Sequence, residues 1–284
     1  MHRIDAPVPC GLLDIAIDVA RAAGGELAAR FGRPHGHDAA APERAAAAAA
    51  AGVLAARRPG DAVRMRHGGD RAGAGLRWLV EPLDGAANHR AGIPLFAVSV
   101  ACEDASGTLA GVVHDPVRDE VYAAVRGGAV RIDGAPAPGE RPSAMAQLLL
   151  AGTVACGTEA EAKRAGKLHK RLARRAAGRR ALGSAALELA WTAAGRFGAC
   201  YQEARLEPPA VDAGLFLCLR AGLRVHRLPP LEDALAPRFL AAREPLAAEL
   251  LELVGPGPKE RRRAAQRPPL SAGSVADAMR RRRR

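Results

Sequence analysis

The chain has 284 residues, of which 49% are apolar, so it can bury one large core or two coupled ones. Its 42 Lys and Arg residues outnumber its 30 Asp and Glu residues, giving a formal net charge of +12, yet aromatic residues make up only 3% of the sequence. Single strands of nucleic acid are bound through stacked aromatic side chains, and the excess charge is mostly Arg in an Ala-rich chain. We therefore interpret the charge as a compositional bias that argues against a nucleic-acid partner.

Targeting and cysteine patterns narrow the class further. No apolar run reaches the roughly 18 residues of a transmembrane helix, and the amino terminus lacks the pattern of a signal peptide. We therefore expect a cytoplasmic protein without a membrane partner. The cysteines have no C-x-x-C spacing, so neither a zinc site nor a disulfide framework is predicted. They are Cys10, Cys102, Cys156, Cys200 and Cys218.

The first half of the chain is predicted to contain helices followed by strands. Apolar residues at three and four spacing predict a helix over 11–31, and an alanine-rich run predicts a second over 45–58. After residue 77 the period changes, and short β-rich runs follow, separated by Gly, Pro and Asp turns. These runs are 79–80, 95–101, 109–113 and 120–125. Helices followed by turn-linked strands predict α+β layers rather than alternating βαβ units.

The second half is predicted to form a separate domain. An irregular, Pro-containing stretch at 139–146 suggests a boundary, which gives domains of 1–145 and 146–254. The second domain is predicted to contain strands at 148–154, 197–201 and 224–228 and helices at 159–177, 184–194 and 213–221. Ser184 is the expected N-cap of its helix. Residues 255–284, rich in Pro, Gly and Arg, are predicted to be a disordered tail.

The segment W-L-V-E-P-L-D-G, residues 78–85, is the most informative motif. It places two carboxylates, Glu81 and Asp84, three residues apart across a proline at the end of an apolar run, which suits a divalent cation and a phosphate. The segment resembles the inositol monophosphatase family of magnesium-dependent phosphatases, in which it usually reads W-x-x-D-P-[LI]-D-G-T-x-N-[FY]. The resemblance covers residues 10–253 and implies the layered αβαβα sandwich of inositol monophosphatases and sugar phosphatases. It also implies a homodimer that acts on a small phosphorylated metabolite.

The resemblance assigns the metal ligands and the catalytic groups. In that family, acidic residues hold two or three magnesium ions, which polarise the phosphate and activate a water. The positions that match are Glu81, Asp84 and the backbone carbonyl of Leu83, with the two carboxylates also counted as catalytic. Glu81 stands where the family has aspartate, so its carboxylate reaches about 1.5 Å further, a large change for octahedral magnesium.

Four family positions are replaced in this chain. Arg66 and His67 stand where relatives have a Glu-Glu pair, and Ala86 replaces a threonine whose hydroxyl helps orient the attacking water. In the second family motif, W-D-x-A-A-G, the metal-binding aspartate falls on Ala210. Whether Asp70 or Asp212 substitutes for a lost ligand stays open here. We interpret Asp212 as a helix cap or a solvated residue.

The segments that bind substrate in the family match this chain more closely than the metal-binding segments do. The residues 183–187, G-S-A-A-L, resemble the family's G-[ST]-A-A-L segment, so Gly183, Ser184 and Ala185 are predicted to line the sugar pocket. Gly85 and Ala86 are assigned to the same pocket. Glu203 matches a glutamate that in the family hydrogen-bonds an inositol hydroxyl.

These residues lead to one main hypothesis and two alternatives. The chain is expected to be an inositol monophosphatase-like protein with a degraded metal site, in which Mg²⁺ binding is weakened or lost and hydrolysis is impaired or absent. The first alternative is weak Mg²⁺-dependent hydrolysis of an inositol, sugar or nucleotide phosphate. The second is a metal-free module that binds anions or nucleic acid.

Overall fold

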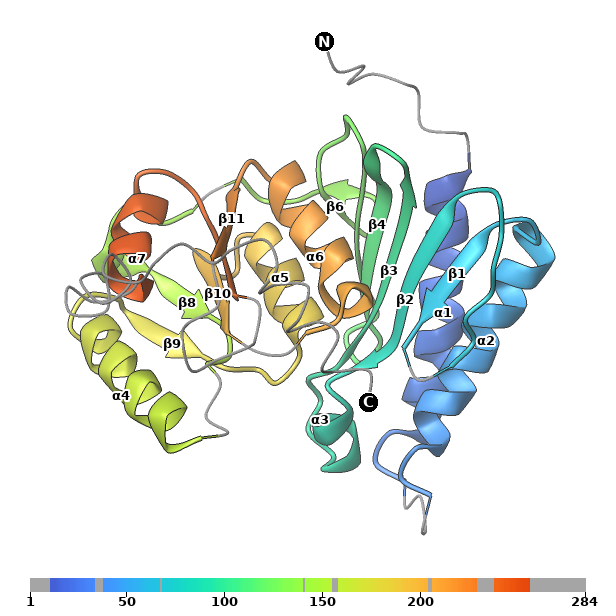
Figure 1. The fold of residues 1–284 in the computed structure, drawn as a ribbon, viewed down its shortest axis with the longest axis horizontal. Helices are drawn as coiled ribbons and strands as arrows, with labels where there is room; N and C mark the ends of the chain where they lie inside the picture. The colour runs from blue at the N-terminus through green and yellow to red at the C-terminus, as the bar shows by residue number, and fades with distance from the viewer. Residues whose placement is uncertain are drawn as a thin grey trace, which may run out of the picture.

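A computed structural model describes residues 11–33, 38–66, 68–139, 141–154, 158–203, 206–228 and 238–255. His67 and the predicted tail beyond Gly255 lie outside these residues. The described part folds into two β-sheets with helices on both faces of each (Figure 1). No helix in it is long and apolar enough to span a membrane.

The first sheet has seven strands in chain order. They are β1 (Ala62–Met65), β2 (Arg77–Asp84), β3 (Ala97–Asp104), β4 (Gly107–Asp115), β5 (Glu120–Val125), β6 (Arg131–Ile132) and β7 (Ala135–Pro136). The pair β1–β2 is parallel, whereas the other neighbours are antiparallel. This sheet carries the W-L-V-E-P-L-D-G motif on β2.

The first sheet is covered on both faces. Helices α1 (Leu12–Arg30) and α2 (Ala41–Arg57) pack on one side, and α5 (Ala185–Ala193) and α6 (Pro208–Arg220) on the other (Figure 1). Alternate side chains of β2 therefore enter different cores: Trp78 and Val80 pack with α1 and α2, while Leu79 packs with α5 and α6. Burial on both faces explains the near-continuous apolar run before the motif.

The second sheet has five strands, in the order β11-β12-β10-β8-β9. They are β8 (Leu149–Ala151), β9 (Gly178–Arg180), β10 (Ala199–Glu203), β11 (Arg224–Leu228) and β12 (Arg238–Ala242). Helices α4 (Glu159–Ala173) and α7 (Leu246–Val254) cover its outer face, and α5 and α6 lie between the two sheets (Figure 1). The predicted α+β class and αβαβα layering are confirmed. The short α3 (Ala86–Arg90) and a 3-10 turn, η1 (Met145–Gln147), complete the elements.

Several predicted element boundaries were wrong for identifiable reasons. The helices α2 and α6 begin earlier than predicted, because Pro42 and Pro208 occupy first-turn positions that favour helix initiation. The strand predicted at 148–154 ends at Ala151, because the φ of Gly152 (129°) lies outside the extended region of ordinary residues. A Cβ at Gly152 would also be 1.7 Å from the Tyr201 carbonyl oxygen, so only glycine fits there. The strand predicted at 197–201 is shifted to 199–203, and the helix predicted at 159–177 ends at Ala173. The elements β1, α3, β9, β12 and α7 were missed.

Candidate functional site

The candidate site begins where β2 ends. Glu81 is fully buried there, Leu83 and Asp84 are buried beside it, and Gly85 turns the chain with φ 92°. A Cβ on Gly85 would lie 2.9 Å from the carbonyl oxygen of Leu95, so both the left-handed backbone and the close packing require glycine. The turn starts α3 at Ala86, which fixes the direction of the chain after the two carboxylates.

Arg66 lies beside Glu81 because of the sheet register. Met65 pairs with Val80 in the parallel β1–β2 ladder, and the backbone N–H of Arg66 donates to the Val80 carbonyl at 3.2 Å. The guanidinium then reaches the next residue of β2, and Nη1 of Arg66 lies 3.3 Å from Oε2 of Glu81. The position predicted to have lost an anion therefore holds a cation against the motif's first carboxylate.

The surroundings of Glu81 disfavour the charged form of its carboxyl group. Burial raises the pKa of its carboxyl to about 8, and the nearby charge of Asp84 acts in the same direction, while Arg66 opposes both. Its second oxygen, Oε1, is buried and has no hydrogen-bond partner among the described residues. Burial and Asp84 therefore favour the protonated carboxyl and Arg66 favours the carboxylate, and one of the carboxyl oxygens is left unsatisfied.

Asp84 is anchored on the start of α5. Its Oδ2 accepts hydrogen bonds from Oγ of Ser184 at 2.6 Å and from the backbone N–H of Ala186 at 2.7 Å. Ser184 is the N-cap, as predicted, and its Oγ also accepts from the backbone N–H of Leu187 at 3.3 Å. Burial raises the pKa of Asp84, although the bonds from Ser184 and Ala186 act against this rise. The two predicted segments, 81–86 and 183–187, thus meet at this carboxylate.

Asn88 holds the same two segments together from the side. Its Nδ2 donates to the carbonyl oxygens of Leu95 and Leu182, each at 2.6 Å. The close approach explains Gly183 (φ 75°), where a Cβ would lie 2.9 Å from this amide nitrogen. Asn88 belongs to the family pattern after the second aspartate, but its bridging role depends on Leu182, far away in the sequence.

Two of the replaced positions, Ala86 and Ala210, offer no ligand atoms, and His67 lies outside the described residues. Ala86 is half-buried at the start of α3, and Ala210 is fully buried in α6, where it packs in the core between the sheets. Oδ1 of Asp70 accepts from the backbone N–H of Met65 at 2.8 Å and so closes its own turn. Asp212 is half-buried in α6, and the prediction of a cap is wrong because the N-cap is Glu207. Within the described ranges no three His, Cys, Asp or Glu residues are grouped to hold a metal ion.

Both carboxylate oxygens of Glu203 accept hydrogen bonds from side chains of the protein itself. It is buried at the end of β10, where Nε of Arg164 donates to Oε1 at 3.1 Å and the Tyr201 hydroxyl donates to Oε2 at 2.7 Å. A second guanidinium nitrogen of Arg164 also donates to Oε1. Sequence reasoning did not find Arg164, because the partner of Glu203 comes from α4, a distant helix.

Glu188 is a further acid near the site that sequence reasoning missed. It is fully buried in α5, with Oε1 accepting from the backbone N–H of Leu182 at 2.5 Å and Oε2 accepting from the Gln202 amide. Burial raises its pKa to about 7. A carboxylate at the centre of an otherwise apolar helix was the available signal, since such a group must find partners inside the protein.

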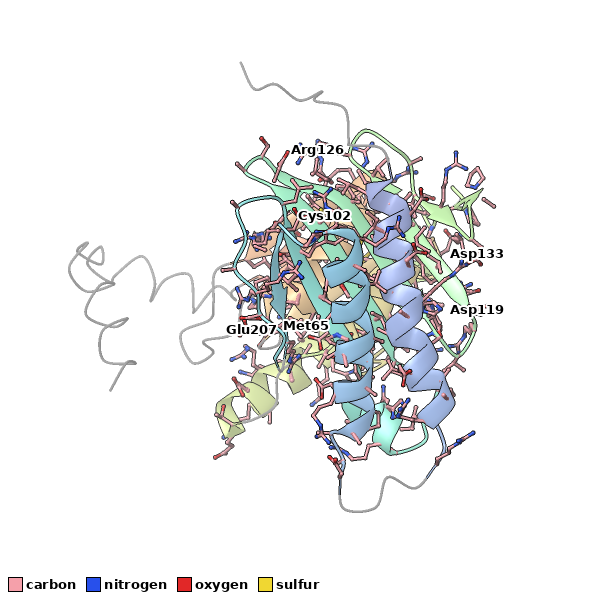
Figure 2. All side chains as sticks on the ribbon, turned by 90° about the vertical axis from the view of Figure 1, so that its right-hand side faces the viewer. Met65, Cys102, Asp119, Arg126, Asp133 and Glu207 are labelled. Carbon is pink, nitrogen blue, oxygen red and sulfur yellow. The ribbon has the colours of Figure 1, made fainter. Side chains whose placement is uncertain are left out.

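A cavity opens next to Arg66. Its volume is about 480 Å³, and its walls come from the β1–β2 connection and the start of α6. The lining residues are Arg64, Met65, Arg66, Gly68, Gly69, Asp70, Glu207 and Pro209. Met65 and Glu207 lie together on one face of the molecule (Figure 2). Nη2 of Arg64 donates to Oε2 of Glu207 at 2.8 Å across this cavity wall.

The sequence is similar to proteins of one family along most of its length. The family described as the inositol monophosphatase family matches residues 11–256. An inositol-1-monophosphatase of Mesorhizobium japonicum is 37% identical over 180 residues, which is 60% of this chain and 64% of that protein. The chain therefore covers slightly less than two thirds of this relative. The Nus factor SuhB of Salmonella typhimurium is 29% identical over 222 residues, 74% of this chain and 83% of that protein.

Solved structures have the same fold. The extragenic suppressor protein suhB of Bartonella henselae superposes with a TM-score of 0.76 at 23% identity, covering 87% of this chain and 99% of that one. The inositol monophosphatase of Anabaena gives a TM-score of 0.68 at 26% identity, covering 92% of this chain and 97% of that one.

Proposed function

Starting from the fact that the chain belongs to the inositol monophosphatase family, we propose that it retains the phosphatase fold but has lost or greatly weakened metal-dependent phosphate ester hydrolysis. The observation that carries the proposal is the contact between Nη1 of Arg66 and Oε2 of Glu81 at 3.3 Å. A guanidinium stays charged under all ordinary conditions, so it competes permanently with a divalent cation for this carboxylate.

The donor set does not fit magnesium of the kind that the family uses. Hard cations are bound according to the number and charge of their oxygen ligands, and magnesium demands near-octahedral geometry. Of the family positions, Glu81, Asp84 and the Leu83 carbonyl remain, whereas Ala210 provides no oxygen and Arg66 adds a positive charge. One oxygen of Asp84 would also have to be shared, since Oδ2 already accepts from Ser184 and Ala186. These features support weakened or lost Mg²⁺ binding.

Water activation is affected separately from metal binding. Ala86 has no hydroxyl to orient an attacking water, and Arg66 cannot serve as a general base. Loss of one positioned group of this type typically lowers the rate by a factor of about 10² or more. The two replacements together therefore support impaired turnover even if a cation is bound.

The test is phosphate release from inositol, sugar and nucleotide monophosphates, with and without Mg²⁺. The double variant Glu81→Ala, Asp84→Ala is compared with a matched variant of two exposed acids, Glu159→Ala, Glu252→Ala, on the outer helices. We expect background release from all three proteins. Magnesium-dependent release by the wild type and the surface variant, but not by the site variant, would establish the alternative of a weakly active phosphatase.

A metal-free anion site is the second candidate function, and the cavity beside Arg66 favours it. Two arginines, Arg64 and Arg66, line a space of about 480 Å³ that can admit a phosphate-sized group. Titration calorimetry with inorganic phosphate in the absence of metal tests this candidate. Binding that is lost in Arg64→Ala would support it, and no heat at millimolar phosphate would exclude it.

A further inference from the structure

Helix α4 has two contrasting faces. It begins with a capping box, in which the Thr158 side chain accepts from the backbone of Glu161 and the Glu161 side chain accepts from the backbone of Thr158. Ala165, Leu168 and Leu172 are buried against the second sheet and α7, so this face holds the helix on the protein. The helix lies at the end of the molecule opposite to α1 and α2, which leaves its other face at the surface (Figure 1).

The outer face carries a row of four cations. Lys163, Lys167, Lys170 and Arg174 follow one another at spacings of four, three and four residues, and all four are exposed. Residues at this spacing lie above one another on a helix, so the charges form a straight line. With a rise of about 1.5 Å per residue, the row is about 16 Å long.

The row is not explained by the arginine bias of the chain. Only four of the 42 basic residues are lysines, at positions 163, 167, 170 and 259, so three of the four lie on this one face. Lys163 pairs with Glu159 at 2.6 Å, but Lys167, Lys170 and Arg174 have no acidic partner within 4 Å among the residues that the structure describes. Three adjacent positive charges therefore remain uncompensated in line.

We propose that this row binds the phosphate backbone of a double-stranded nucleic acid without reading its sequence. Lysine ammonium groups neutralise phosphates as point charges, and a straight row of them can follow one strand of a duplex. This proposal reverses the expectation drawn from composition, because the arrangement of the charges, not their number, carries it. It does not depend on whether the phosphatase site is active.

The chemistry of α4 favours a duplex over other anionic partners. Protein interfaces rely on aromatic, Met and Arg anchors and are poor in lysine, yet α4 contains no Phe, Trp, Tyr or Met. Among the described residues the exposed large apolar side chains are Ile93, Val117 and Leu219, none of them on α4, so nothing apolar is available here to enter a bilayer either. The lack of Phe, Trp and Tyr side chains equally disfavours single strands.

The test measures fluorescence anisotropy of a labelled mixed-sequence duplex at several salt concentrations, using the full-length chain. The variant Lys167→Glu, Lys170→Glu, Arg174→Glu is compared with Arg21→Glu, Arg33→Glu, Arg131→Glu, which reverses three exposed arginines elsewhere and so has the same net charge. Removing three phosphate contacts should weaken binding about tenfold or more and lower the slope of log K against log salt by about 2 to 3. The control variant should stay within about twofold of the wild type. Thermal melting verifies that both variants fold.

Four results would overturn the proposal. Equal weakening in both variants would show that net charge alone attracts the duplex, as a basic tail could also do. Unchanged binding in the α4 variant would show that the duplex binds elsewhere. No binding at low salt would show that a duplex is not a ligand. Binding of polyglutamate or of vesicles containing phosphatidylserine as tightly as the duplex, and with the same loss in the α4 variant, would identify a protein or a membrane as the partner class instead.

Discussion

Nη1 of Arg66 lies 3.3 Å from Oε2 of Glu81, so a cation supplied by the chain itself faces a carboxylate that is fully buried. The arginine side chain is 37% exposed, and its charge is therefore partly screened by solvent. The contact places a fixed positive charge at the centre of the candidate site, and its removal gives the most direct prediction.

We expect Arg66→Glu to make the protein respond to magnesium. Without the cation, a new carboxylate beside Glu81 and Asp84 should lower stability by about 1–2 kcal/mol through like-charge repulsion and loss of the ion pair. Millimolar Mg²⁺ should recover this loss, because the added carboxylate increases the number of oxygen ligands. Thermal denaturation with and without Mg²⁺ measures both effects.

The matched control is Arg64→Glu, which reverses a nearby arginine on β1 that pairs with the exposed Glu207. It should show no magnesium-dependent shift. A rise of several degrees in the melting temperature of the wild type on adding Mg²⁺ would contradict the idea that Arg66 has replaced the metal.

Gly85→Ala should destabilise the protein by about 2–3 kcal/mol. The substitution combines an unfavourable left-handed backbone (φ 92°) with a Cβ placed 2.9 Å from the Leu95 carbonyl oxygen. Gly52→Ala is the control, since this glycine is exposed on α2 with open space around it and should gain about 0.5–1 kcal/mol. Urea denaturation measures the pair, and similar effects of the two substitutions would show that the turn after Asp84 is not tightly packed.

Ser184→Ala tests the connection between β2 and α5. The change removes the N-cap acceptor and one of the two donors to the buried Asp84, so we expect a loss of about 2–3 kcal/mol in the free energy of unfolding. Thr158→Ala removes the exposed cap of α4, which touches no buried carboxylate, and should cost only about 1 kcal/mol. If the two losses are equal, the bond to Asp84 adds nothing beyond ordinary capping.

Glu188→Gln should change how stability depends on pH. Burial raises the folded-state pKa of Glu188 from 4.5 to about 7, so between these values the folded protein holds a proton that the unfolded chain has released. The contribution of this group is therefore fully present below pH 4.5 and is lost as the pH rises through 7. The slope approaches about 1.4 kcal/mol per pH unit.

The measurement is the difference in unfolding free energy between wild type and variant at pH values from 5 to 8. The variant should gain relative to the wild type as the pH rises and then level off above 7. Glu81, whose pKa is also raised, is present in both proteins and cancels in the difference. Glu252→Gln, an exposed acid on α7, should give a difference that does not change with pH.

The fold was predictable wherever local patterns were strong. The helix at Leu12–Arg30 and the strands at Glu120–Val125 and Arg224–Leu228 agree with the periodicity of their residues. The missed strand β1 is only four residues long and is interrupted by Arg64, and it owes its conformation to pairing with β2. A four-residue strand whose stability comes from its neighbour has little signal of its own.

The candidate site was predictable only in part. The motif identified Glu81, Asp84 and Ser184, and the structure brings these three residues together. Arg66 was identified at a replaced position of the same site, and its contact with Glu81 agrees with this. The contact of Arg164 with Glu203 was not predictable, because it depends on the packing of a distant helix. The residues of a motif show which chemical groups it contains. The charges around those groups are set by contacts with residues that are distant in the sequence.

The side-chain amide of Asn88 makes one hydrogen bond to a residue nearby in the sequence and one to a residue far away in the sequence. Its bond to the Leu95 carbonyl closes a loop of 7 residues, while its bond to the Leu182 carbonyl spans 94. Short loops close early at small entropic cost, but the longer closure has to wait until the layers between the sheets have docked. We therefore expect the two bonds to form at different stages of folding, with the bond to Leu182 among the last native contacts to form.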